Sequence, residues 1–445
     1  MELKERWTSS FYFVLAATGA AVGLGSIWKF PYEVGYHGGG LFVLLYLIFI
    51  VLIGIPAMIA EMTVGVIGRN DPIHAISAIK NTGHCAWWWQ FLGVLSLVTL
   101  MCIFSFYSVV AGWAIDYLLW SFQVSFDSLS PGDILKHWES LQASPERLVY
   151  LHTAFCMMTA SVILFPLQRG LERASKYLMP LLFLVVILLV FVAHSLPGSA
   201  KALTYLFEFR VEEFNSTVML IALGNACFTL ASGAGAMLMY GAYLPKKTNV
   251  FNVAGTVAIL NALVALMSGY AIFSVVFSYN VAADSGPGLM FTTLPLCFKQ
   301  LAYGQALGIA FFLLLVVAAW TSALSLLEPW VCFLSQKLNC SRPIAALLAT
   351  LLGWFLGIGT VISLNIGKSW YLVSNLNFYQ LIDFISTDIF LNIGLMGYAL
   401  LIGWGISHQL IKNNFHAPDW IINIWFFMVK YLLPLSFIIM ILGIV

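Results

Sequence analysis

The residues Gly19–Phe30 read GAAVGLGSIWKF and lie inside the first long apolar run of the chain. Glycine is the poorest helix former after proline, and Gly19, Gly23 and Gly25 stand within seven positions of one another. A membrane-spanning helix with this sequence would be weak at its middle. The stretch therefore predicts a helix that is interrupted halfway across the bilayer.

A packing role is the alternative explanation, because Gly19 and Gly23 form the small-xxx-small pattern by which membrane helices approach closely. That explanation leaves out Gly25, which falls off the packing face, and the polar Ser26 and Lys29 that follow. Unwound backbone at bilayer depth is tolerated only where protein buries it or a watery cavity lines it. A binding site is therefore the better interpretation of the stretch.

The composition indicates a polytopic membrane protein. Hydrophobic residues make up 61% of the 445 residues and charged residues only 9%. Soluble domains carry about 25% charged residues, so this chain cannot cover a globular surface with polar groups. A net charge of +1 gives no reason to expect a nucleic-acid partner.

Apolar windows of roughly 20 residues predict about eleven spans in an all-α polytopic fold. They are 9–33, 38–66, 88–121, 148–166, 176–196, 215–243, 251–279, 306–335, 343–364, 376–408 and 420–444. Lysine and arginine are in excess on the side of the N-terminus, which favours a cytoplasmic N-terminus. The chain is therefore expected to be a multi-pass protein of the inner (plasma) membrane. The odd number of spans then places its C-terminus on the outer side of that membrane.

A second interruption is expected in the sixth span, at the glycine- and alanine-rich stretch 229–236. The two breaks are five spans apart, which predicts two inverted five-helix repeats, 9–196 and 215–408, with a short N-terminal segment 1–8 and a last helix 420–445. Paired interruptions of this kind mark the substrate and ion site of secondary transporters.

Several polar residues lie well inside apolar windows, where an unpaired charge costs roughly 2.5–3.5 kcal/mol. For Glu61 two roles are equally open: bracing the freed amides of a broken helix, or serving as an ion ligand.

Several motifs resemble those of the neurotransmitter:sodium symporter family, in particular its compact bacterial amino-acid transporters with the leucine-transporter fold. The resemblance runs nearly end to end and in order. It rests on Trp7, the stretch 19–32 and Gly38–Gly40, on 54–56 with Glu61, on 169–176 with Pro180, and on 286–291 with Pro295.

The resemblance implies Na⁺-coupled import of an amino acid by alternating access, with one or two Na⁺ ions. A hard cation such as Na⁺ suits neutral and carboxylate oxygens, which the chain offers at depth. One Na⁺ site would use Gly19, Val22, Ala318, Thr321 and Ser322. The other would use Ala21, Ser26, Thr229 and Asn261. The family usually has asparagine at position 26, and a serine hydroxyl reaches less far, so this site is expected to be weaker, water-assisted or absent.

The same resemblance implies a substrate pocket. The amino-acid carboxylate would meet the amides at Leu24 and Gly25 and the Tyr107 hydroxyl, and the ammonium group would meet carbonyls near the two breaks. Such a pairing is the one that helix-end charges favour. The pocket is expected to be lined by Ala20, Ala21, Leu24, Gly25, Ile103, Tyr107, Phe228, Thr229, Ala231, Ala234, Ser322 and Leu326. Alanine replaces bulkier family residues at several of these positions, which predicts a large hydrophobic substrate, aromatic or branched.

Gates and chloride are also expected from the resemblance. Lys29 and Asp383 match the outer charged pair, with lysine replacing the usual arginine, and Lys4, Trp7 and Tyr243 match the N-terminal latch and its receptor. The family usually has an acidic residue that receives this latch, and here Gln336 stands at that position. Ala265 stands at a chloride position, while Tyr46, Asn225 and Thr229 retain polar groups, so chloride dependence stays open.

H⁺ coupling through Glu61 or Asp383, a substrate-gated channel and a non-transporting receptor stay open as alternatives. An enzyme is not expected, because the eight histidines show no HExxH spacing and the seven cysteines no CxxC pair. The expected partners are the substrate and the lipid bilayer, and the oligomeric state is unknown.

Overall fold

The chain folds into a bundle of helices in the computed structural model, which describes residues 5–81, 85–279, 288–301, 303–373 and 375–444. Among these residues no β-strand occurs, and only two isolated bridges form, one of which joins Gly39 and Phe209. The predicted all-α class is confirmed.

Most of the predicted spans appear as long apolar helices. Within the described residues eight helices can cross a membrane by length and composition, and α1 with its continuation adds a ninth although it is bent by 58°. The two remaining predicted spans coincide with α8 (Pro145–Ile163) and with the pair α11 (Ser216–Thr229) and α12 (Ala236–Ala242).

The elements of the first half, including short 3₁₀ (η3–η5) and π-helical (η1, η2) turns, are α1 Ser10–Ala21, η1 Gly25–Lys29, α2 Phe30–Tyr36, α3 Gly40–Phe49, η2 Ile50–Gly54, α4 Ile55–Gly68, α5 Pro72–Asn81, η3 Trp87–Trp89, α6 Gln90–Gln123, η4 Phe126–Ser128, α7 Pro131–Ala143, α8, α9 Leu171–His194, α10 Ser199–Phe207 and η5 Val211–Glu213.

Those of the second half are α11, α12, α13 Val250–Ser278, η6 Leu289–Thr293, α14 Leu294–Phe298, α15 Gly304–Lys337, α16 Arg342–Leu364, α17 Phe378–Asp383, η7 Phe384–Phe390, α18 Leu391–Leu400, η8 Leu401–Gly405, α19 His408–Asn414, α20 Asp419–Phe427, η9 Met428–Leu432 and α21 Leu433–Ile444.

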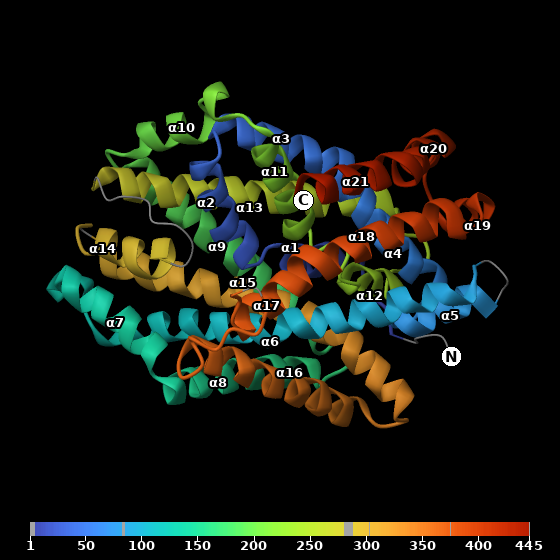
Figure 1. Ribbon diagram of the computed structural model, residues 1–445, viewed down its shortest axis with the longest axis horizontal. Coiled ribbons are helices and arrows are strands. Elements are labelled where there is room, and N and C mark those ends of the chain that lie inside the picture. The colour runs from blue at the N-terminus through green and yellow to red at the C-terminus, as the bar shows by residue number, and fades with distance from the viewer. Residues whose placement is uncertain (1–4, 82–84, 280–287, 302, 374, 445) are drawn as a thin grey trace.

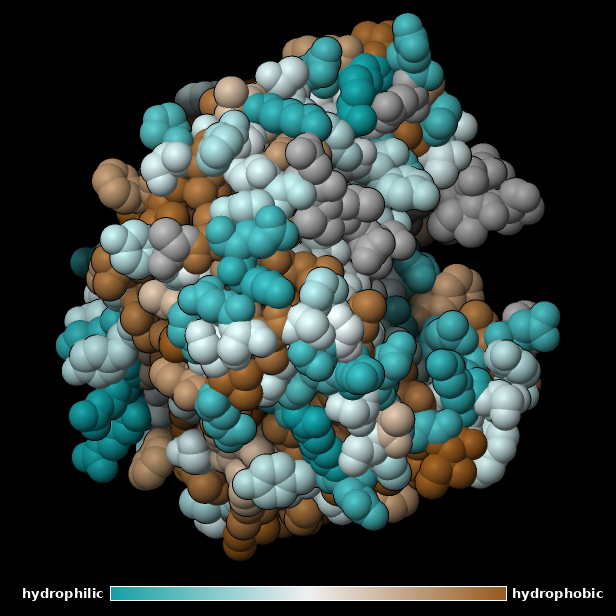
Figure 2. Space-filling view, turned by 90° about the vertical axis from the view of Figure 1, so that its left-hand side faces the viewer, coloured by the Kyte–Doolittle hydropathy of each residue, from teal (hydrophilic) through white to brown (hydrophobic). Residues whose placement is uncertain are grey.

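The long helices lie roughly along one axis of the molecule (Figure 1). The described N-terminal residues, from Glu5 onward, lie at one end with α5 and α19; we call this the inner end. The short helices α7, α10 and α14 lie at the other, outer end. Hydrophilic residues are spread over the outer end face, with hydrophobic patches between them (Figure 2), as expected for a surface that meets water.

These short helices occupy stretches that the sequence presents as connections between spans. For α7 the local cause is a capping box, in which Ser130 and Asp133 each satisfy the backbone N–H of the other. Pro131 at the first helical position favours the same start. The predicted loop motif at Gly286 and Pro287 lies outside the described residues.

Both predicted interruptions are present. The first helix ends at Ala21 and resumes at Gly25. The second break separates Thr229 from Ala236 and contains three residues with positive φ: Ala231 at 50°, Gly233 at 93° and Gly235 at 91°. Glycine adopts such angles without steric cost, which explains why the break falls in this stretch.

Close helix contacts hold the second break in place. A Cβ atom on Gly65 of α4 would lie 1.9 Å from the carbonyl oxygen of Leu238, and one on Gly241 would lie 2.4 Å from the carbonyl oxygen of Met62. No side chain fits at either position, so α4 and α12 pack backbone to backbone. This contact fixes the inner half of the broken helix against a continuous one.

Candidate functional site

The two helix breaks lie side by side in the middle of the bundle. A Cβ atom on Gly25 would lie 2.6 Å from the ring of Phe228, so the restart of the first helix touches the end of α11. Around these breaks the structure places two groups of neutral oxygen atoms and one cavity.

The first oxygen group joins α1 to α15. The Ser322 hydroxyl lies 3.1 Å from the carbonyl oxygen of Gly19 and 3.3 Å from that of Ala20. A Cβ atom on Gly19 would lie 3.0 Å from Cβ of Thr321, whose hydroxyl bonds to the Ala318 carbonyl of its own helix at 3.1 Å. Val22, the fifth predicted residue of this group, caps α1 and is fully buried.

The second oxygen group is a chain of hydrogen bonds across five elements. The buried Ser26 hydroxyl lies 3.4 Å from the Ala21 carbonyl and 2.7 Å from Oδ1 of Asn261. Nδ2 of Asn261 donates to the Tyr46 hydroxyl at 3.4 Å, and that hydroxyl lies 3.0 Å from Oγ1 of Thr229. The structure thus brings all four predicted residues together, with Tyr46 as the link between Asn261 and Thr229.

Both groups offer uncharged oxygens at short range, which suits a hard monovalent cation such as Na⁺. Among the described residues no set of three histidine, cysteine or acidic side chains gathers as a transition-metal site would require.

A cavity of about 620 Å³, including space open to solvent, lies between the breaks. Every residue predicted for the substrate pocket lines it: Ala20, Ala21, Leu24, Gly25, Ile103, Tyr107, Phe228, Thr229, Ala231, Ala234, Ser322 and Leu326. The Leu24 amide donates to the Tyr107 hydroxyl at 3.3 Å. The lining of the cavity therefore combines a helix start and a hydroxyl with apolar side chains.

Sequence reasoning missed five lining residues: Gly23, Phe106, Ala236, Ser325 and Leu391. For Ser325 a signal existed, since it lies one helical turn after Ser322. Gly23 is required by close approach, because a Cβ atom there would lie 2.7 Å from the Ser322 hydroxyl. Leu391 belongs to a helix that only the tertiary structure brings to the cavity.

Glu61 is fully buried on α4 and faces the second break. Its carboxylate accepts hydrogen bonds from the amides of Gly233 at 2.5 Å, Met237 at 2.8 Å and Leu238 at 3.2 Å. These amides have no helical partner at the break, so the carboxylate supplies what the unwound chain lacks. Of the two roles open from sequence, this geometry favours bracing.

On the outer side, Phe228 and Leu391 separate the cavity from a second one of about 900 Å³, which also includes space open to solvent. Lys29, Glu33 and Asp388 line this outer cavity. The Lys29 ammonium lies 5.1 Å from the centre of the Phe228 ring, and no ion pair within 4.0 Å joins it to Asp383, both residues being described. The predicted outer pair is therefore not closed in this structure.

At the inner end, Trp7 is buried and its amide donates to the Tyr243 carbonyl at 3.1 Å. Lys4, the other predicted latch residue, lies outside the described residues. Gln336 donates to Oδ1 of Asn70 at 2.6 Å and to Oδ2 of Asp71 at 3.2 Å.

Comparison with known proteins identifies the family. The profile of the sodium:neurotransmitter symporter family matches residues 4–130 and 132–442. The chain belongs to this family. It is 32% identical to the uncharacterized sodium-dependent transporter YhdH of Bacillus subtilis, over 99% of this chain and 97% of that protein. It is 26% identical to the sodium- and chloride-dependent GABA transporter 2 of Mus musculus, over 80% of this chain and 67% of that protein.

Among solved structures, the crystal structure of MhsT in complex with L-phenylalanine matches with a TM-score of 0.90 and 33% identity. The match covers 99% of this chain and all of that one. The chain is therefore a multi-pass membrane protein of a transporter family with the leucine-transporter fold, as the sequence predicted.

Proposed function

We propose that the chain is a Na⁺-coupled symporter that imports a large hydrophobic amino acid by alternating access. The observation that carries this proposal is the cavity between two helix breaks, bordered by two groups of neutral oxygens. Substrate and ions would order the same unwound segments, which is what coupling requires.

The α-carboxylate of the substrate would lie at the start of η1. Leu24, Gly25 and Tyr107 line the cavity there, and the Leu24 amide already donates to the Tyr107 hydroxyl. A carboxylate at a helix start gains both hydrogen bonds and the favourable end of the helix dipole. The α-ammonium would be met by carbonyls of Ala21, Phe228 and Thr229.

The substrate side chain would occupy the apolar wall formed by Ala20, Ile103, Ala231, Ala234 and Leu326. Small side chains on this wall leave room that a small polar amino acid would not fill. The ligand of MhsT, a protein 33% identical, is L-phenylalanine, which supports an aromatic substrate for this chain.

The pocket assignment is tested by enlarging Ala234 stepwise to Val, Leu and Phe. Because Ala234 is buried in the cavity wall, each step removes volume from the substrate side. Phenylalanine and tryptophan should be rejected first. We expect their affinity for Ala234→Phe to fall at least about tenfold, because overpacking a filled site costs about 1–3 kcal/mol. Equal binding of all amino acids by wild type and Ala234→Phe would contradict the assignment.

The coupling ion is tested by scintillation-proximity binding of labelled amino acids to the purified protein at rising Na⁺ concentration. A Hill slope near two is expected if both oxygen groups bind Na⁺, and a slope near one if only the group around Ser322 does. Proteoliposome uptake that persists without Na⁺ and collapses with the pH gradient would contradict Na⁺ coupling and support the H⁺-coupled alternative. Exchanging chloride for gluconate in the same assay tests chloride dependence.

A further inference from the structure

The N-terminal segment, residues 5–9, crosses the inner end of the bundle; we call it the strap. Trp7 is 2% exposed, and its indole donates to the Tyr240 carbonyl at 3.4 Å. Arg6 donates to the Ala242 carbonyl at 3.1 Å, and the Thr8 amide donates to Glu172 at 3.0 Å. The strap is thus bound to the inner half of the broken helix and to the start of α9.

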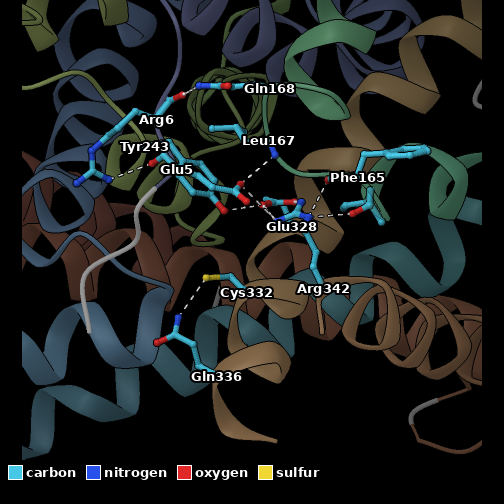
Figure 3. A network of polar contacts seen from close by, with 11 residues as sticks. Glu5, Arg6, Phe165, Leu167, Gln168, Tyr243, Glu328, Cys332, Gln336 and Arg342 are labelled. Carbon is cyan, nitrogen blue, oxygen red and sulfur yellow. Dashed lines mark hydrogen bonds and ion pairs between the residues drawn. The ribbon is translucent and has the colours of Figure 1, made fainter. Parts of the chain in front are cut away.

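Arg342, the first residue of α16, joins several segments at this end (Figure 3). Its guanidinium donates to both carboxylate oxygens of Glu328, at 3.0 and 2.5 Å, and to the carbonyls of Ile163 and Phe165 at the end of α8. Glu328 is fully buried on α15 and also accepts a hydrogen bond from the Tyr243 hydroxyl at 2.6 Å. A bidentate, buried pair of this kind is costly to separate.

Glu5 connects the strap to this network. Its carboxylate lies 3.8 Å from Nη1 of Arg342 and accepts a hydrogen bond from the Leu167 amide at 2.9 Å. The Glu5 side chain is 35% exposed, whereas that of Glu328 is 0% exposed. Arg342 therefore has two carboxylate partners: Glu328, which is buried, and Glu5, which is partly exposed to solvent.

The charges of this contact are opposite to those expected from the family resemblance. The family resemblance predicts a basic residue, Lys4, on the strap. It predicts that the bundle carries the acidic partner, at position 336. Here the residue at 336 is a glutamine engaged with Asn70 and Asp71, while the strap presents an acid, Glu5, to a base of the bundle.

We propose that Glu5 is a positioning residue that holds the inner end closed through Arg342. Opening this end would require Glu5 to leave Arg342 while Glu328 keeps the guanidinium in place. The inference rests on the proposed function only in that a carrier must open its inner end. Removal of the contact should shift the protein toward its inward-open form without disturbing the buried pair.

Cys332 offers a native reporter of this opening. It is 6% exposed, lies on α15 between Glu328 and Gln336, and accepts from the Gln336 side chain at 3.3 Å (Figure 3). Its modification by a hydrophilic maleimide, measured on the purified protein without Na⁺, should rise roughly two- to fivefold in Glu5→Gln, as expected for a partly exposed ion pair. The rate in Cys332→Ser gives the background of the other cysteines.

The charge dependence separates a latch from a merely structural contact. Glu5→Asp should keep a rate near that of wild type, whereas Glu5→Lys should exceed Glu5→Gln because it faces Arg342 with a like charge. Asp419→Asn is the matched control, since it removes an exposed acid paired with Lys412 on another element. It should leave the rate unchanged.

The salt dependence of Cys332 modification gives a second test, and it can be measured on the wild-type protein. Raising choline chloride should speed Cys332 modification in wild type, because salt screens the exposed pair, and should have little effect in Glu5→Gln. The proposal is overturned if Glu5→Gln and Asp419→Asn give the same rate, or if wild type and Glu5→Gln respond equally to salt. Neither readout uses Na⁺ or an amino acid, so a failure of Na⁺-dependent binding would count against the proposed function alone.

Discussion

The hydroxyl of Ser26 is fully buried and lies 2.7 Å from Oδ1 of Asn261, in the group that we propose as the weaker Na⁺ site. Ser26→Ala removes one oxygen from that group and leaves the asparagine oxygen without this donor, which costs about 1–3 kcal/mol when the partner stays buried. We expect the Na⁺ concentration needed for substrate binding to rise about tenfold, or the Hill slope to fall toward one. Equilibrium binding at varied Na⁺ measures both.

Ser325→Ala is the control for this change, because Ser325 lines the same cavity but its hydroxyl donates to the Ser322 carbonyl of its own helix at 2.7 Å. Its removal should leave the Na⁺ dependence as in wild type. If Ser26→Ala and Ser325→Ala have the same Na⁺ dependence, Ser26 is not an ion ligand.

His74 gives a prediction about pH at the inner end. Its Nδ1 lies 2.6 Å from Oδ2 of the buried Asp71, and this hydrogen bond raises the pKa of His74 above its usual value, against the effects of desolvation and Lys337. A histidine with a raised pKa in the folded state stabilises that state most below its unfolded pKa, near about 6.5, and loses this contribution as the pH rises through the folded pKa.

The melting temperature of the wild type should therefore fall between about pH 6 and pH 8 by more than that of His74→Gln. His194→Gln serves as control, since His194 bonds to the Tyr270 hydroxyl rather than to a carboxylate. Parallel pH profiles for wild type and His74→Gln would contradict the prediction.

At the scale of elements, the second break depends on a single carboxylate, because Glu61 accepts from one amide within the break and from two amides in the first turn of α12. Glu61→Gln keeps one acceptor oxygen but replaces the other with an NH₂ group. That group would face backbone N–H groups, which are themselves donors. We expect a loss of about 1–3 kcal/mol of stability, seen as a lower melting temperature in detergent. Glu146→Gln, at an exposed position of α8, is the control. Equal melting temperatures would show that Glu61 does not brace the break.

How far the sequence predicts these elements depends on whether the signal is local. Both breaks were predictable, because the glycines around Gly23 and Gly235 are poor helix formers. The twelve pocket residues followed from the family resemblance rather than from composition. The inverted-repeat arrangement was inferred from the spacing of the breaks and stays a prediction.

Contacts between distant elements were not predictable, because no local pattern encodes them. Nothing in the sequence places Tyr46 between Asn261 and Thr229, or Glu5 beside Arg342. The same applies to the Lys29 ammonium, whose position over Phe228 instead of beside Asp383 depends on side-chain conformation. The capping box at Ser130, by contrast, was a local signal for α7 that the apolar windows concealed.

At the scale of the whole molecule, the proposed ion groups and the cavity share residues. Ser322 and Ala21 line the cavity and also belong to the two oxygen groups. If both ligands bind as proposed, ordering of the breaks by one of them would lower the cost of binding the other. Such coupling would be reciprocal: the factor by which Na⁺ raises affinity for the amino acid would equal the factor by which the amino acid raises affinity for Na⁺.

We expect this factor to lie between about 5 and 150, the usual range for coupled sites. It is measured by titrating L-phenylalanine at low and saturating Na⁺, and then Na⁺ with and without L-phenylalanine. In Ser322→Ala the link from α15 to the carbonyls of Gly19 and Ala20 is lost. The factor should then fall toward one even where each ligand still binds, while Ser325→Ala should keep it. A factor near one in the wild type would mean that ions and substrate bind independently, which would favour an uncoupled carrier or a receptor over a symporter.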